Sequence, residues 1–160
     1  MLRSLVLVCA GIFGTAVQLG AAAADFSPQV WINPGIYSYH LDRDTDYRED
    51  NVGFGVEVLI TDDHMIMGGS FINSDGERSR YGLYTWRPLH WEVSTVRFSA
   101  GIALAALDGY TAYHNGDWFV APVPLLAIEW KRLGVNFTFI PKVHESLDTA
   151  IGIQVKLRVW

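Results

Sequence analysis

The sequence has a single cysteine, Cys9, among its 160 residues. One cysteine cannot form a disulfide within the chain, so the fold does not depend on a disulfide framework. Charged residues are also sparse, at 18 %, and acidic side chains outnumber basic ones by 17 to 12. The resulting formal net charge of −5 argues against nucleic acid as a partner, because phosphate binding needs a basic surface.

Long apolar runs are missing beyond the first two dozen residues. The one such run, residues 5–17, follows Arg3 and leads into small residues ending at Ala24. This order is typical of a secretory signal peptide cleaved after Ala24, so residues 1–24 are expected to be removed. A membrane-spanning helix needs about 20 apolar residues, which suits the run poorly. Cys9 leaves with the peptide, and residues 25–160 are expected to form one domain.

Apolar residues make up 50 % of the chain and aromatic residues 13 %, and they alternate with polar ones. The pattern is clearest in the last eleven residues, where every second residue is aliphatic: Ile151, Ile153, Val155, Leu157 and Val159. A strand turns successive side chains to opposite faces, so this period of two predicts a β-strand with one apolar face. A soluble sandwich could show the same alternation, and strand length has to decide.

Eight such strands are predicted, over residues 29–41, 52–61, 64–73, 80–86, 91–107, 118–130, 133–140 and 149–160. Most are near the 9–11 residues that a tilted strand needs to cross a bilayer, whereas soluble strands are nearer 5–6 residues. Their connections alternate between short turns and long polar loops, as in outer-membrane barrels. We therefore expect an all-β fold, an eight-stranded antiparallel transmembrane β-barrel in the cell outer membrane.

The terminal residue departs from this pattern. Outer-membrane barrels often end in an aromatic residue in the apolar frame, but the frame of Trp160 contains Arg158, Lys156 and Gln154. A β-bulge near the end of the last strand would shift Trp160 by one position, because a bulge places two residues opposite one.

The expected lumen-facing positions change in character along the barrel axis. Small residues occupy the outer half and are expected to contact substrate: Gly53, Gly55, Gly101, Ala103 and Gly152. Charged residues occupy the periplasmic half: Glu57, Glu129, Arg97, Lys156 and Arg158. The grading predicts a dry pocket for a hydrocarbon chain above a closed polar floor. Alternatively, bulky residues from the other strands fill the space, as in a purely structural barrel.

Prolines interrupt three of the predicted strands. Pro34 lies in the first, Pro122 and Pro124 lie in the sixth, and Pro141 ends the seventh. Proline cannot donate a ladder hydrogen bond, so these positions could open gaps between strands wide enough for a lipid tail. Local kinking of the strands is the simpler explanation.

Candidate catalytic groups gather where ascending strands reach the outer rim. His40 ends the first strand, and Asn73, Ser74 and Asp75 follow the third. A histidine base beside a serine or carboxylate is what acyl transfer requires. Alternatively, His40 is an interfacial histidine without a catalytic role, and residues 73–75 only form a turn. Ser38, two residues before His40 and on the same face, makes a second candidate esterase pair.

No histidine pair has the spacing of metal ligands, since His64, His90, His114 and His144 lie far apart in turns and loops. The sequence gives no sign of a metal or cofactor.

Several segments together resemble the lipid A palmitoyltransferases of Gram-negative outer membranes, the PagP-type family. The carriers of the resemblance are residues 33–36 leading to His40, then residues 53–55, 85–89, 121–126 and 136–141. The resemblance implies an eight-stranded outer-membrane barrel that moves a palmitoyl chain from a phospholipid to lipid A. It maps the catalytic histidine onto His40 and the serine onto Ser74, and it maps gating prolines onto Pro34, Pro122 or Pro124, and Pro141. The family has Asp-Ser at the serine, whereas here Asn73 precedes Ser74 and Asp75 follows it.

The chain is thus expected to be a divergent acyltransferase of membrane lipids, acting as a monomer, with His40, Ser74 and Asp75 (or Asn73) at the site. Two rival functions remain. A lipid A deacylase would use Ser38 and His40. A structural barrel without catalysis would have its lumen packed by Ile66, Ile72, Tyr84 and their neighbours.

Overall fold

The computed structural model describes residues 27–42, 44–142 and 148–160. The predicted signal peptide and His144 lie outside the described residues. Eight strands form one closed barrel in which each strand pairs antiparallel with its neighbours in sequence and β8 pairs with β1. The strands are β1 (Gln29–His40), β2 (Asp50–Leu59), β3 (His64–Ile72), β4 (Arg78–Val93), β5 (Val96–Leu107), β6 (Phe119–Trp130), β7 (Leu133–Ile140) and β8 (Ala150–Arg158). The predicted eight-stranded antiparallel barrel is confirmed.

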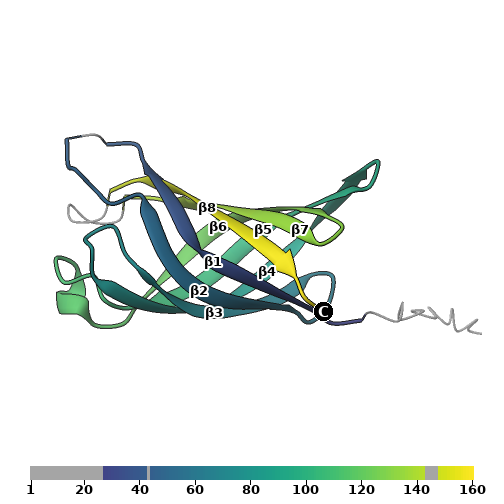
Figure 1. Ribbon diagram of the computed structural model, residues 1–160, viewed down its shortest axis with the longest axis horizontal. Helices are drawn as coiled ribbons and strands as arrows, with labels where there is room; N and C mark the ends of the chain where they lie inside the picture. The colour runs from purple at the N-terminus through teal and green to yellow at the C-terminus, as the bar shows by residue number, and fades with distance from the viewer. Residues whose placement is uncertain (1–26, 43, 143–147) are drawn as a thin grey trace, which may run out of the picture.

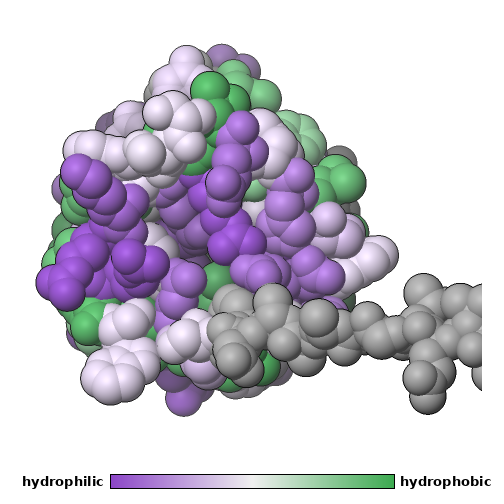
Figure 2. All heavy atoms as spheres, turned by 90° about the vertical axis from the view of Figure 1, so that its right-hand side faces the viewer, coloured by the Kyte–Doolittle hydropathy of each residue, from purple (hydrophilic) through white to green (hydrophobic). Residues whose placement is uncertain are grey.

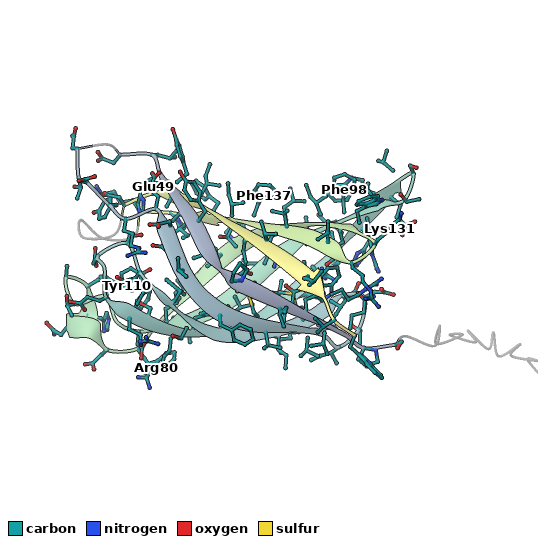
Figure 3. The ribbon with its side chains drawn as sticks, viewed as in Figure 1. Glu49, Arg80, Phe98, Tyr110, Lys131 and Phe137 are labelled. Carbon is teal, nitrogen blue, oxygen red and sulfur yellow. The ribbon has the colours of Figure 1, made fainter. Side chains whose placement is uncertain are left out.

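The two ends of the barrel differ in their connections (Figure 1). One end, here called the loop end, carries the long loops 41–49, 73–77, 108–118 and 141–149, the third of which contains the 3₁₀ helix η1 (His114–Gly116). The other, the turn end, carries the short turns 60–63, 94–95 and 131–132 and the C-terminus. Figure 3 places Glu49, Arg80 and Tyr110 at the loop end and Lys131 at the turn end. Among the described residues, no helix is long and apolar enough to cross a membrane.

The turn between β4 and β5 was predicted in the wrong place. Residues 87–90 were expected to form it, but β4 continues to Val93 and the chain reverses at residues 94–95. The register of β4 against β5 shifts between Trp86 and Leu89, so Pro88 lies in a bulge where a missing N–H does no harm. A proline indicates a bulge as readily as a turn. Because the strand continues through this bulge, the hairpin of β4 and β5 extends beyond β3, as Figure 1 shows.

The last strand ends in the bulge that the frame of Trp160 predicted. The carbonyl of Val30 accepts hydrogen bonds from the amides of both Val159 (2.8 Å) and Trp160 (3.2 Å). Two residues of one strand therefore face one residue of the other, which defines a bulge. The shift leaves the Trp160 side chain 78 % exposed on the outer surface.

Strand alternation separates an apolar outer surface from a graded interior. Val52, Phe54, Leu104, Val120 and Val155 are all more than half exposed, and they alternate with buried positions on their strands. Ile66 and Tyr84 also lie on the outer surface, 44 % and 47 % exposed, so they do not pack the lumen. The alternate residues of each strand face the interior.

A buried charge network, here called the floor, closes the interior toward the turn end. Lys156 Nζ donates to Glu57 Oε1 (2.5 Å) and to Glu129 Oε1 (2.7 Å), and Arg87 donates to the same Glu129 oxygen (3.2 Å). Asn136 adds a hydrogen bond to Glu57 (2.8 Å). Two cations balance two anions, as a buried network requires. Viewed onto the turn end, polar side chains gather over the middle of the barrel (Figure 2).

The predicted floor was correct in its carboxylates but only partly in its cations. Arg97 instead pairs with Asp62 at the turn end (2.6 Å), and Arg158 lies over the ring of Trp31 at 5.6 Å. Arg87 takes their place, because it continues the inward frame of Thr85 on β4 and is fully buried. It was missed because residues 87–90 were predicted to form a turn.

Candidate active site

A cavity occupies the interior between the floor and the loop end. Its wall is mostly apolar and includes Met67, Phe71, Leu83, Ala103, Ala121, Val123 and Leu125. Its inner end is formed by Asn136 and Gln154, which border the floor. On β6 the lining runs from Phe119 to Leu125. At a rise of about 3.3 Å per residue and a tilt of about 40°, that stretch spans roughly 15 Å along the barrel axis.

Strand pairing is incomplete on two sides of this cavity. Within the described strands, β6 pairs with β7 only from Leu125 to Trp130, so the part of β6 that contains Pro122 and Pro124 pairs with β5 alone. On the other side, the registers of β1 against β2 and against β8 both shift around Pro34. The prolines therefore lie where the ladder is interrupted, in the outer half of the barrel. Pro141, just beyond β7, lines the cavity itself.

The small residues predicted to contact substrate divide into two groups. Ala103 lines the cavity and is 1 % exposed. Gly53, Gly55, Gly101 and Gly152 are not among its lining residues. A side chain at Gly55 would meet Tyr81 and Asn33, and one at Gly152 would meet Thr138 and Ile36. These glycines make room for neighbouring side chains, which in turn shape the cavity: Tyr81, Thr138 and Ile36 all line it.

The predicted catalytic residues His40, Ser74 and Asp75 all line the mouth of the cavity at the loop end. His40 comes from the end of β1 and is 7 % exposed, while Ser74 and Asp75 come from loop 73–77. The antiparallel order of β1, β2 and β3 brings these distant segments together, because β1 and β3 both run toward the loop end.

His40 is held by aromatic stacking. Its ring stacks on Tyr47 with centroids 4.4 Å apart and an interplanar angle of 24°. The Tyr47 hydroxyl donates to Asp148 Oδ2 (2.9 Å), and Lys142 donates to Asp148 Oδ1 (2.8 Å). These two bonds lower the pKa of Asp148 below its usual value, so this carboxylate is ionised at neutral pH. Tyr47, Lys142 and Asp148 are thereby tied together beside the imidazole.

Ser74 lies against Ser38, with 3.2 Å between the two hydroxyl oxygens. The Ser38 oxygen is also 2.6 Å from the amide of Asn51 on β2. On the main chain, the amide of Arg48 donates to the carbonyl of Ser74 (3.0 Å). The structure therefore joins the two serines that the rival hypotheses had treated as alternatives.

Asn73 and Asp75 have different surroundings. Asn73 is fully buried, and its oxygen accepts from the amides of Asp75 (3.0 Å) and Glu77 (2.9 Å). Its nitrogen donates to Ser79 Oγ (3.0 Å) and to the carbonyl of Gly109 (2.8 Å). Asn73 is thus fully engaged in shaping the turn, and Asp75 is the side chain at the mouth.

Electrostatics at the mouth act on Asp75 and Tyr110. Partial burial and then the neighbouring Glu77 raise the pKa of Asp75 above its usual value, while the proximity of His40 works in the opposite direction. Burial, followed by the charge of Asp75, raises the pKa of Tyr110 far above its usual range, so this phenol keeps its proton. The mouth therefore presents an imidazole, a carboxylate and neutral hydroxyl groups.

Asn51, Tyr47 and Tyr110 were not identified from the sequence as site residues, although all three line the cavity. Tyr47 and Tyr110 lie in long loops, where no periodicity indicates direction. Asn51 was assigned to a loop because the start of β2 was placed two residues late, at Val52 instead of Asp50. Asn51 directly follows the charged residues 48–50, so no signal in the sequence indicated that its side chain faces the lumen.

Comparison with known proteins adds an independent observation. No protein-family model matches the chain. The chain is similar to the lipid A acyltransferase PagP of Laribacter hongkongensis (strain HLHK9), with 26 % identity over 128 residues. The match covers 76 % of this chain and 59 % of that relative, so the chain spans about three fifths of the relative's length. This similarity, together with the eight-stranded barrel, confirms the resemblance to PagP-type lipid A acyltransferases predicted from the sequence.

Proposed function

We propose that this protein is an outer-membrane acyltransferase that moves a palmitoyl chain from a phospholipid to lipid A. The observation that supports this best is the position of His40, Ser74 and Asp75 at the mouth of a closed-bottomed apolar cavity. The similarity to a lipid A acyltransferase supports the enzyme class. A cavity with a mostly apolar wall suits a hydrocarbon chain.

In the proposed reaction, His40 removes the proton from a hydroxyl group of lipid A, and that oxygen attacks the ester carbonyl of the phospholipid. A tetrahedral intermediate forms, and its collapse breaks the bond to the glycerol oxygen, which takes the proton from the imidazolium. Ser74 donates a hydrogen bond to the carbonyl oxygen as negative charge develops on it. Asp75 stabilises the transient positive charge on His40, in keeping with their proximity.

The cavity then holds the acyl chain being transferred. Its depth of roughly 15 Å matches about twelve extended methylene groups at about 1.25 Å each, given C–C bonds of about 1.5 Å. The first carbons of a palmitoyl chain would lie higher, between the loop residues Tyr47 and Tyr110 at the mouth. The polar end formed by Asn136 and Gln154 stops the chain, because an apolar terminus gains nothing by entering the floor. The interruptions at Pro34 and at Pro122 and Pro124 offer lateral routes for the lipid tail.

The apolar outer surface supports a location in the outer membrane, and we propose that the loop end faces the outside of the cell. Seven of the eight strands have the 9 or more residues needed to cross, β7 has 8, and the exposed aliphatic residues form the lipid-facing band. The short turns then face the periplasm. No partner other than the two lipids is needed for the reaction.

The rival functions fit the site less well. A structural barrel was expected to pack its lumen with Ile66, Ile72 and Tyr84, but Ile66 and Tyr84 lie on the outer surface and Ile72 does not line the cavity. A deacylase using Ser38 as nucleophile needs that hydroxyl free, but its oxygen lies within hydrogen-bond distance of both Asn51 and Ser74. The deacylase remains the second candidate, since Ser38 and His40 both line the cavity.

Mass spectrometry of lipid A from a host expressing the gene tests the proposal. Wild-type protein is expected to add one palmitoyl chain, and His40→Ala should lower the yield by at least 10²-fold, as expected for loss of a central group in acyl transfer. His64→Ala, which changes a histidine remote from the cavity, serves as the matched control. Lipid A that loses a chain would favour the deacylase, and full activity in His40→Ala would overturn the role of this residue.

A further inference from the structure

The mouth of the cavity contains a second serine that the proposed mechanism does not use. Ser38 lies on β1, is 5 % exposed and lines the cavity next to Ser74. Its hydroxyl contacts two side chains from different segments, Asn51 on β2 and Ser74 in loop 73–77. A buried hydroxyl with two partners has a defined direction for its single hydrogen, and that direction can be worked out.

The orientation of Asn51 fixes the order of the bonds. The outer atom of its amide faces two carbonyl oxygens, those of Ile72 (3.1 Å) and Arg48 (3.3 Å), so this atom must be the nitrogen. The opposite assignment would place an oxygen against two acceptors. The Asn51 oxygen therefore points at Ser38 and accepts its hydrogen at 2.6 Å. With its only hydrogen given to Asn51, Ser38 is an acceptor toward Ser74.

We propose that Ser38 and Asn51 are positioning residues that hold the hydroxyl of Ser74 at the cavity mouth for the transferred ester. This inference rests on the proposed acyl transfer and adds to it. Before substrate binds, the Ser74 hydrogen is directed at Ser38. When the ester arrives, a small rotation about the bond between Cβ and Oγ of Ser74 shares that hydrogen between Ser38 and the ester carbonyl oxygen, so the contact with Ser38 is kept in the transition state.

The hydrogen bonds from Ser74 to Ser38 and from Ser38 to Asn51, here called the relay, are held rigid by the main chain around them. Arg48 donates its amide hydrogen to the carbonyl of Ser74, and its own carbonyl accepts from Asn51. A ring of contacts thus joins β1, β2, loop 41–49 and loop 73–77. Because each member has a partner on both sides, Ser74 cannot turn away from the cavity without breaking a bond. Such preorganisation of a donor is the main source of stabilisation in acyl-transfer sites.

A kinetic double-mutant cycle tests the inference with purified protein in detergent, a phospholipid donor and lipid A as acceptor. Ser38→Ala is expected to lower kcat about 10-fold, the size of one lost hydrogen bond, with KM within about 2-fold. Ser38→Thr, which keeps the hydroxyl, should restore most of the activity. In a Ser74→Ala background, Ser38→Ala should have no further effect, because Ser38 acts through Ser74.

The possible results separate this inference from the proposed function. Wild-type protein that transfers no acyl chain would overturn the acyl transfer and the relay with it. Transfer that is unchanged in Ser38→Ala, or reduced equally with and without Ser74, would overturn the relay alone. Activity that survives Ser74→Ala but is abolished by Ser38→Ala would make Ser38 the nucleophile.

A second measurement tests the contact itself, without activity. In a chain with Cys9→Ser, the pair Ser38→Cys and Ser74→Cys should form a disulfide under mild oxidation, because the two hydroxyl oxygens that the sulfurs would replace lie 3.2 Å apart. The pair Ser38→Cys and Ser99→Cys, with both serines buried but Ser99 on the turn-end half of β5, should not. Absence of the first disulfide in folded protein would overturn the relay.

Discussion

Asn73 and Asp75 lie two residues apart in one loop, yet the side chain of Asn73 is buried in the turn and that of Asp75 lies at the cavity mouth. Asn73 satisfies four polar groups of the turn and is inaccessible. Asp75 is exposed at the mouth, and its carboxylate form is disfavoured by burial and by Glu77. An ionised side chain that lowers the stability of the folded state is typical of functional sites, where stability is lost in favour of activity.

Asp75→Asn should therefore raise the thermal midpoint at pH 7 while lowering acyl transfer about 10-fold or more. The raised pKa means that the folded state favours the protonated acid, so ionised Asp75 opposes folding at neutral pH. The gain in stability should shrink as the pH falls toward and below the usual aspartate value of 3.8, where the carboxyl is protonated in both states. Heat-induced mobility shifts on gels at several pH values measure the midpoint.

Asn73→Ala is the contrasting control in the same loop. It leaves the amides of Asp75 and Glu77 and the carbonyl of Gly109 without their partner, so the midpoint should fall at every pH. An Asp75→Asn variant that is destabilised like Asn73→Ala would show that Asp75 has a structural role.

At the scale of strands, the floor joins four strands, no two of which are neighbours in the barrel. Glu57 comes from β2, Arg87 from β4, Glu129 from β6 and Lys156 from β8. Lys156 contacts both carboxylates and is fully buried, so it is the centre of the network. Removing one partner of a buried pair leaves an uncompensated charge in a medium of low dielectric constant.

Lys156→Met is expected to destabilise the barrel by about 3–5 kcal/mol. The reason is that Glu57 loses its cation, whereas Glu129 keeps Arg87. Arg97→Met is the matched control, because its ion pair with Asp62 lies at the partly exposed turn end and should contribute less than about 1 kcal/mol. Urea-induced unfolding in micelles measures both, and equal effects would contradict a central role for the floor.

At the scale of the whole molecule, the strand pattern predicted the number, direction and faces of the strands. Period-two alternation survives in each strand because one side meets an apolar surface and the other the lumen. The pattern failed at Pro88, where a bulge and a turn have the same local signature. It also failed for the four glycines, because a missing side chain indicates close approach without saying whether a ligand or a neighbouring residue fills the space.

The candidate site was predictable in part for the same reason. His40 and Ser74 end ascending strands, so topology alone brought them to one rim. Asn51, Tyr47 and Tyr110 could not be placed, since the direction of a loop side chain depends on contacts distant in sequence. The bond between Ser38 and Ser74 joins residues 36 apart and needed the actual register of β1, β2 and β3.

The proposed orientation makes a prediction for the intact cell. With Cys9 as the single cysteine of the chain, new cysteines can be labelled selectively. Asn115→Cys, exposed in loop 108–118, should react with a membrane-impermeant maleimide on whole cells. Glu92→Cys, exposed near the turn between β4 and β5, should react only after the outer membrane is permeabilised. The reverse pattern would show that the barrel is inserted the other way round.

The floor also has a consequence for how the barrel is assembled. Its two negative and two positive side chains come from alternate strands, ending with β8, the last to be synthesised. Glu57 on β2 therefore waits for Lys156 until β8 meets β1, and a partly assembled sheet carries an unneutralised carboxylate. Because such a charge is strongly disfavoured in hydrocarbon, we expect an open intermediate to be held back from full insertion until the pairing of β8 with β1 neutralises the interior.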